Sequence, residues 1–129
     1  MRLGYVILMV PDVDSTMSFY ERAFDLKRRF IDDTKKYGEM ETGQTRLAFV
    51  ADDLARGMIP VDLSRAGPKA AAPPMDLAFT TENVEAAHTQ AMAAGAVEIK
   101  APEKKPWGQI VSYVRDNNGF LVEICSPLP

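Results

Sequence analysis

The chain has 129 residues, of which 47% are hydrophobic and 26% charged, and this composition predicts one folded domain with an apolar core. Its formal net charge is −3 and its acidic and basic residues are interspersed, which argues against nucleic acid and anionic membranes as partners. The single cysteine, Cys125, cannot form an internal disulfide, and neither a charged-then-apolar leader nor a long apolar run is present. We therefore expect a cytoplasmic protein with no nucleic-acid and no membrane partner.

The first part of the chain predicts one helix between strands. Residues 3–10 form an apolar run of strand length, after which Asp12 or Asp14 can cap a helix that extends to about Phe24. Short acidic side chains suit this position because they accept hydrogen bonds from the unpaired amides of a first helical turn. Three strand-like segments follow, at residues 27–31, 37–41 and 45–50, so the predicted order is β-α-β-β-β.

Residues 52–74 contain several glycines and prolines and predict a linker. Within it, the apolar stretch at 58–61 is either an extra strand or a packed piece of loop. The same order of elements is then predicted again, with a strand at 76–81, a helix from Glu82 or Asn83 to Ala94 that Gly95 closes, and strands at 97–100, 109–114 and 120–125. We expect a loop at 102–106 and a hairpin turn at 115–119.

The two halves also share a degenerate sequence repeat. A shift of 71 positions places Leu8 on Phe79, and Gly43 and Gly119 open a second pair of similar segments. Each unit is too small to bury its apolar face alone, so a neighbouring unit must complete it. We therefore predict a single α+β domain over residues 1–129. Two βαβββ modules, module one at about 1–51 and module two at about 75–129, form a curved, incomplete mixed-sheet barrel with helices outside and a concave ligand groove.

Three segments carry a resemblance to a known family: Val10-Pro-Asp-Val-Asp-Ser-Thr-Met-Ser-Phe-Tyr-Glu-Arg-Ala-Phe, Pro106-Trp-Gly-Gln and Asp116-Asn-Asn-Gly-Phe-Leu-Val-Glu-Ile. The chain resembles the glyoxalase / bleomycin-resistance / extradiol-dioxygenase superfamily, also called the vicinal oxygen chelate superfamily. Its members range from isomerases and dioxygenases to thiol transferases and drug-sequestering proteins. The resemblance implies a homodimer, but no single activity.

The resemblance also implies where a divalent metal would lie. Metal-dependent members use four positions, one on the first and one on the last strand of each module, which carry His or Glu. These positions fall on Tyr5, Leu47, Asp76 and Glu123, of which only Glu123 matches. The one histidine of the chain, His88, lies in a predicted helix, so no site with two or three histidines can form. We predict no metal and no cofactor; the alternative is Mg²⁺ or Mn²⁺ held by Asp76, Glu123 and water.

Glu123 is the first candidate site residue. It stands between two apolar residues of the last strand, so the alternation of side chains points it toward the concave face. We interpret it as an anchor for a polar ligand group or as a general base with a raised pKa. The alternative is a carboxylate bonded only to water or to a nearby Tyr or Arg.

The other candidate ligand-binding residues are mostly aromatic. Trp107, in a loop between Pro106 and Gly108, predicts a stacking platform or a dimer contact. His88 is expected to be a partly exposed helix residue, and Cys125 to be unreactive because it has no basic neighbour. The remaining predicted groove residues are Tyr5, Met9, Phe49, Asp76 and Tyr113.

Three functions are consistent with these features. The first is a metal-independent small-molecule-binding protein of the bleomycin-resistance type, with an aromatic or cationic ligand held in the concave groove. The second is a metal-dependent glyoxalase-like lyase or isomerase with Glu123 as the base. The third is an accessory or partner-binding domain without catalysis.

Overall fold

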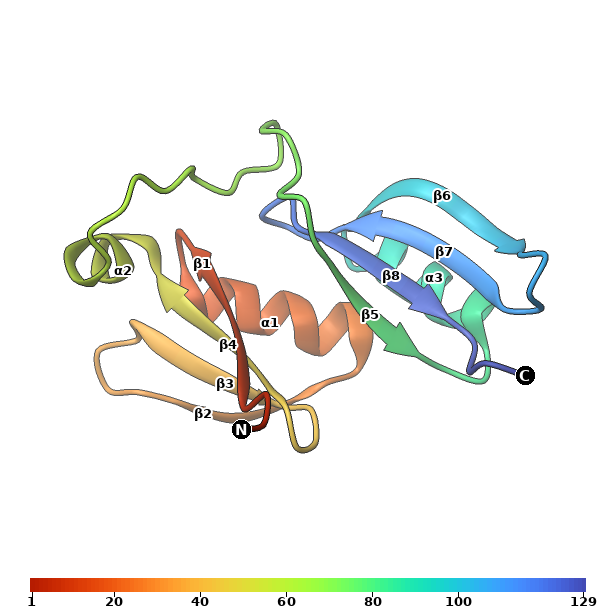
Figure 1. Ribbon diagram of the computed structural model, residues 1–129, viewed down its shortest axis with the longest axis horizontal. Coiled ribbons are helices and arrows are strands. Elements are labelled where there is room, and N and C mark those ends of the chain that lie inside the picture. Colours follow the sequence, from red (N-terminus) through yellow and green to blue (C-terminus); the bar gives the residue numbers. More distant parts are fainter. The chain divides into compact units, whose positions relative to one another are not determined.

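The computed structural model describes residues 1–129 and contains eight strands and three helices (Figure 1). The chain clusters into two compact units, residues 1–21 with 25–66 and residues 22–24 with 67–129. None of the helices is long and apolar enough to cross a membrane. In chain order the elements are β1 (Tyr5–Val10), α1 (Val13–Phe24), β2 (Lys27–Ile31), β3 (Tyr37–Glu41), β4 (Arg46–Ala51), α2 (Asp52–Met58), β5 (Asp76–Thr80), α3 (Val84–Ala93), β6 (Val97–Lys104), β7 (Ile110–Arg115) and β8 (Leu121–Cys125).

Module one is a four-stranded mixed sheet with strand order β1-β4-β3-β2, against which α1 packs (Figure 1). Strands β1 and β4 are parallel, whereas β3 is antiparallel to both β4 and β2. Asp12 caps α1 as predicted, because its Oδ1 accepts a hydrogen bond from the Ser15 amide at 2.8 Å. The helix ends at Asp25, which takes a left-handed conformation with φ of 56°.

The contact between α1 and the first sheet depends on a small residue at its centre. The side chain of Met17 from α1 lies where a Cβ on Gly38 would be, so only glycine lets the helix approach this closely. At the sheet margin Arg28 binds the helix, with Nη1 donating to Asp14 at 2.6 Å and Nε donating to Glu21 at 2.8 Å. Apolar packing at the centre and ion pairs at the edge together fix α1 on one face of the sheet.

Module two repeats this arrangement with strand order β5-β8-β7-β6 and α3 on one face (Figure 1). Asn83 caps α3 as predicted, since its side chain accepts from the Ala86 amide at 3.0 Å. The hairpin turn expected at 115–119 is also present between β7 and β8. There, Asp116 Oδ1 accepts hydrogen bonds from the amides of Asn118 and Phe120 at 2.9 and 2.8 Å.

Two sequence-based expectations differ from the structure. The start of the predicted linker is helix α2, which runs to Met58, so the extra strand considered at 58–61 is wrong. Two acids in the first turn of α2 favour the helix because they interact with its positive end. Strand β6 continues to Lys104 through the predicted loop, and Pro102 is tolerated because β6 is an edge strand. The predicted fold class is confirmed: the fold is α+β, with two four-stranded mixed sheets that are not closed into a barrel.

Candidate ligand-binding site

Two buried contacts show which face of each sheet its helix covers. In module one the ring of Phe49 lies 5.0 Å from the ring of Tyr20 in α1. In module two Ser112 Oγ lies 3.0 Å from Nδ1 of His88 in α3. Because side chains alternate along a strand, the neighbours of Phe49 and Ser112 point to the opposite face. We call this opposite side of each sheet the helix-free face.

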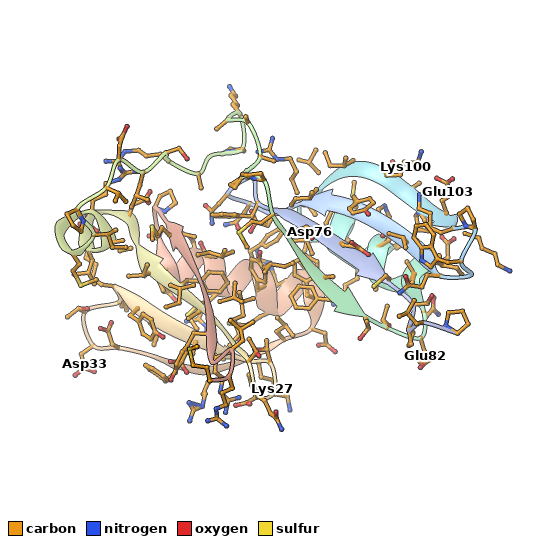
Figure 2. The ribbon with its side chains drawn as sticks, viewed as in Figure 1. Lys27, Asp33, Asp76, Glu82, Lys100 and Glu103 are labelled. Carbon is orange, nitrogen blue, oxygen red and sulfur yellow. The ribbon has the colours of Figure 1, made fainter.

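The helix-free face of module two carries a cluster of polar side chains from three adjacent strands. Tyr113 in β7 lies directly across from Glu123 in β8. On the other side of β8, Asp76 in β5 pairs with the residue two positions before Glu123 (Asp76 is labelled in Figure 2). The side chains of Asp76, Tyr113 and Cys125 all lie within hydrogen-bonding reach of the Glu123 carboxyl group. The structure therefore brings together three predicted site residues, Glu123, Asp76 and Tyr113.

Burial raises the pKa of Glu123 because it disfavours the charged form, and the adjacent Asp76 raises it further because a second negative charge beside it is unfavourable. Burial, and after it the charge of Glu123, also raise the pKa of Tyr113 and of the Cys125 thiol. Cys125 therefore remains a thiol rather than a nucleophilic thiolate, in line with the unreactive cysteine expected from the sequence.

No basic residue neutralises this carboxyl pair. None of the ion pairs in the structure includes Glu123 or Asp76. Arg115 donates instead to the backbone carbonyls of Gly119 and Ala70, each at 2.7 Å. Lys100 on β6 pairs with Glu103 at 3.3 Å (Figure 2). The site can therefore accept hydrogen bonds or a positive charge from outside the chain.

The strand register corrects one of the four positions assigned to a metal. Leu8 pairs with Phe49 in module one, and Phe79, its equivalent in the repeat, pairs with Ile124 in module two. Ala48, rather than Leu47, is therefore the equivalent of Glu123. Leu47 is buried on the helix side of its sheet, one position before Ala48.

The residues present do not fit the divalent metal that the resemblance implies. Alanine and leucine offer no ligand atom, and Tyr5 is the one oxygen donor among the module-one positions considered. The only histidine, His88, is buried beneath α3 on the other face of its sheet. Within neither module do three His, Cys, Asp or Glu side chains gather in a way that could hold an ion. Asp76 and Glu123 alone would leave most of the coordination to water.

The remaining predicted groove residues lie in different surroundings. Tyr5 and Met9 are on the helix-free face of β1, where Tyr5 is 55% exposed. The placement of Phe49 as a groove wall is wrong, because its side chain is 0% exposed and packs on α1. Trp107 stands in the turn between β6 and β7 and is 58% exposed, with Nε1 donating to Gln109 Oε1 at 2.8 Å. An exposed indole held in one orientation suits a stacking contact.

Two polar residues lie in environments that the sequence-based reasoning missed. His88 is buried rather than partly exposed, and its Nε2 lies 2.7 Å from Glu98 Oε2 while Nδ1 faces Ser112. Glu39, at the centre of β3, is also buried. Because side chains alternate along a strand, the sequence could have shown that Glu39 lies on the same face as Tyr37 and on the opposite face from Gly38 and Met40. For His88 the partners come from other strands, so no local pattern could identify them.

The comparisons with known proteins agree with the fold. The family model described as the Glyoxalase/Bleomycin resistance protein/Dioxygenase superfamily matches residues 2–124. A glyoxalase-related enzyme from Fulvimarina pelagi superposes with a TM-score of 0.85 at 18% sequence identity, covering 98% of this chain and 88% of that chain. A superfamily enzyme from Burkholderia phytofirmans PsJN gives 0.81 at 21% identity, covering 98% of each chain. A protein of unknown function from Agrobacterium tumefaciens superposes with a TM-score of 0.78 at 27% sequence identity, covering 99% of this chain and 95% of that chain. The comparison with curated proteins found no match.

Proposed function

Because the chain belongs to the glyoxalase/bleomycin resistance protein/dioxygenase superfamily, we propose that it is a metal-independent small-molecule-binding protein of the bleomycin-resistance type. The ligand binds the helix-free face of module two at Glu123, Asp76 and Tyr113. One observation carries this proposal: the half-buried carboxyl group of Glu123 lies beside the exposed carboxyl group of Asp76, and none of the ion pairs includes either of them. A ligand that brings a positive charge or several donor groups completes the pair.

The chemistry of the three side chains supports a cationic, partly aromatic ligand. A hydrogen bond to a charged group contributes about 1.5–3 kcal/mol and a neutral one about 0.5–1.5 kcal/mol, so a charged donor gains about 1–1.5 kcal/mol, or roughly fivefold to tenfold in affinity. Tyr113 remains protonated because its pKa is raised, so it offers both a donor and an aromatic ring. Asp76 is exposed, which leaves the pair accessible to a ligand from solvent. Trp107, also in module two, is the candidate stacking residue.

A second candidate function is a lyase or isomerase in which Glu123 is the general base. The raised pKa of Glu123 favours this reading, because a carboxyl group that titrates nearer neutrality is a better proton acceptor. A metal-dependent version finds little support in module one, where Ala48 and Leu47 offer no ligand atom. An accessory, partner-binding domain is the remaining alternative and predicts no small-molecule affinity.

Calorimetric titration of chelator-stripped protein separates these functions. We expect no micromolar binding of Mn²⁺, Ni²⁺ or Zn²⁺, and we expect benzamidinium to bind roughly fivefold to tenfold more tightly than its neutral isostere benzamide at pH 7.5. Glu123→Gln should abolish that preference, whereas Glu82→Gln, which changes an exposed acid of the same module, should not. Micromolar metal binding that Glu123→Gln removes would overturn the metal-independent proposal. Equal binding of the two probes would overturn the cationic-ligand proposal.

We also propose that the protein is a homodimer, as the resemblance to the superfamily implies, and that it is cytoplasmic, as its single cysteine favours. Light scattering after size-exclusion chromatography measures the mass of the particle directly. If Trp107 is the dimer contact rather than a stacking residue, Trp107→Ala should produce monomers. If it is a stacking residue, the same variant should weaken ligand binding and leave the mass unchanged.

A further inference from the structure

The linker between the modules, residues 59–75, contains no helix or strand (Figure 1), but side chains of the modules hold much of it in place. Its first part binds α2. Arg56 Nη1 donates to the carbonyl of Leu63 at 2.7 Å, and Arg56 Nη2 donates to that of Ser64 at 3.2 Å. A guanidinium group has its donors in a fixed planar arrangement, so two successive carbonyls bound to it are fixed relative to the helix. We call residues 59–64 the first arm.

The second part of the linker binds module two. Arg115, the last residue of β7, donates from Nη2 to the carbonyls of Ala70 at 2.7 Å and Gly67 at 3.5 Å, and from Nε to that of Gly119 at 2.7 Å. Arg115 thus joins the linker to the β7–β8 turn. The contact is close, because a Cβ on Gly119 would overlap the Gly67 carbonyl. We call residues 67–75 the second arm.

Between the two arms, residues 65–66 lack comparable support. The backbone of neither residue takes part in a hydrogen bond. The Arg65 side chain is 65% exposed and its Nη1 lies 3.7 Å from Asp52 Oδ2, a distance too long for a strong hydrogen bond, so this ion pair contributes little. The two compact units of the chain also divide here, between Ala66 and Gly67. The chain can therefore bend at residues 65–66 while both arms remain bound.

We propose that residues 65–66 are a hinge between the modules, and that Arg56 and Arg115 hold the rest of the linker in place on either side of it. Two extended residues span about 7 Å, whereas release of the second arm would free residues 65–75, which span up to roughly 40 Å. Arg115 therefore limits how far the two modules can move apart. Hinges are typically a few residues that absorb large changes in φ and ψ, and the arms confine these changes to one short segment. The proposal does not depend on the ligand site of module two.

The test is ¹⁵N relaxation of the ligand-free protein, which measures an order parameter for each backbone amide. In the wild-type protein we expect values near the roughly 0.85 of a rigid backbone in both arms, and values below about 0.6 only at residues 65–66. Arg115→Met keeps the apolar stem of the side chain but removes every donor, so it should lower the values of the second arm alone. Arg56→Met should lower those of the first arm alone. Each variant is thus the control for the other.

A further variant displaces the second arm without altering Arg115. Gly119→Ala should release this arm by steric overlap, whereas Gly43→Ala, at a position with similar positive φ and no neighbouring atoms, should not. Digestion with trypsin reports the same release, since Lys69 lies in the second arm and Arg65 in the hinge. Wild-type protein should be cut first after Arg65, and Arg115→Met should accelerate cleavage after Lys69 at least about tenfold.

Three results would overturn the proposal. Order parameters below about 0.6 along the whole wild-type linker would show a free tether. Equal loosening of both arms by Arg115→Met would show that the arms are not held separately. Equal cleavage of the wild-type protein after Arg65 and after Lys69 would show that flexibility is not confined to the hinge. Because Arg115→Met and Gly119→Ala act through different contacts, a variant that fails to fold leaves the other to decide.

Discussion

Replacing Phe49 with alanine tests the assignment of the two faces of the first sheet. The ring is 0% exposed and lies 5.0 Å from the ring of Tyr20. Removing about 150 Å² of buried aromatic surface at roughly 25 cal/mol per Å² costs about 4 kcal/mol. Measured Phe→Ala costs in protein cores, which include the cavity left behind, are about 3–5 kcal/mol. We therefore expect Phe49→Ala to reduce the free energy of unfolding by about 4 kcal/mol.

Urea denaturation followed by circular dichroism measures this loss directly. The matched control is Tyr5→Ala, an aromatic truncation at a 55% exposed position of the same sheet, for which we expect less than about 1 kcal/mol. If Phe49 instead lined an open groove, its truncation would cost as little as that of Tyr5. A loss of stability below about 1.5 kcal/mol for Phe49→Ala would therefore refute the assignment of faces. It would also refute the placement of Ala48 on the helix-free face.

Three further predictions follow from individual environments. Burial and a neighbouring carboxyl raise the pKa of Glu123 in the folded protein, so its contribution to stability is present below the ordinary Glu pKa and lost as pH rises through the raised one. Glu123→Gln should thus raise the melting temperature at pH 8 but not at pH 4; the same change at both would contradict the shift. His88→Leu leaves the buried Ser112 hydroxyl without its partner and should cost about 1–3 kcal/mol in urea denaturation, whereas a loss below about 0.5 would argue against this contact. Gly119→Ala should cost more than Gly43→Ala, because both have positive φ but a Cβ meets other atoms only at Gly119; equal thermal shifts would remove the steric part of this argument.

Much of the fold could be predicted from local sequence. The caps Asp12 and Asn83, the turn at 115–119 and the repeated β-α-β-β-β order all depend on residues a few positions apart. Caps and turns form through hydrogen bonds between a side chain and the adjacent backbone, so their signals are local. The repeat then indicated two similar modules because each has the same apolar pattern.

The sites were harder to predict because they depend on strand register. Aligning the repeat on Gly43 and Gly119 placed Leu47 where the structure has Ala48, an error of one residue. In a strand, one residue is the difference between the helix side and the helix-free face, so the error also concealed that Phe49 belongs to the core. Register is set by pairing between strands that are distant in sequence, and single-strand patterns do not contain it.

The sequence by itself determined most of the elements and their order, and that Glu123 points away from the apolar residues on either side of it in its strand. Only the tertiary structure decided which side chains bind each carboxyl group: Arg29 binds Glu39, His88 lies 2.7 Å from Glu98, and none of the ion pairs includes Glu123. The physical reason is that an ion pair needs two groups within a few ångströms, and in each module that distance is set by pairing and packing between segments far apart in the chain. The same packing sets the burial that raises the pKa of Glu123.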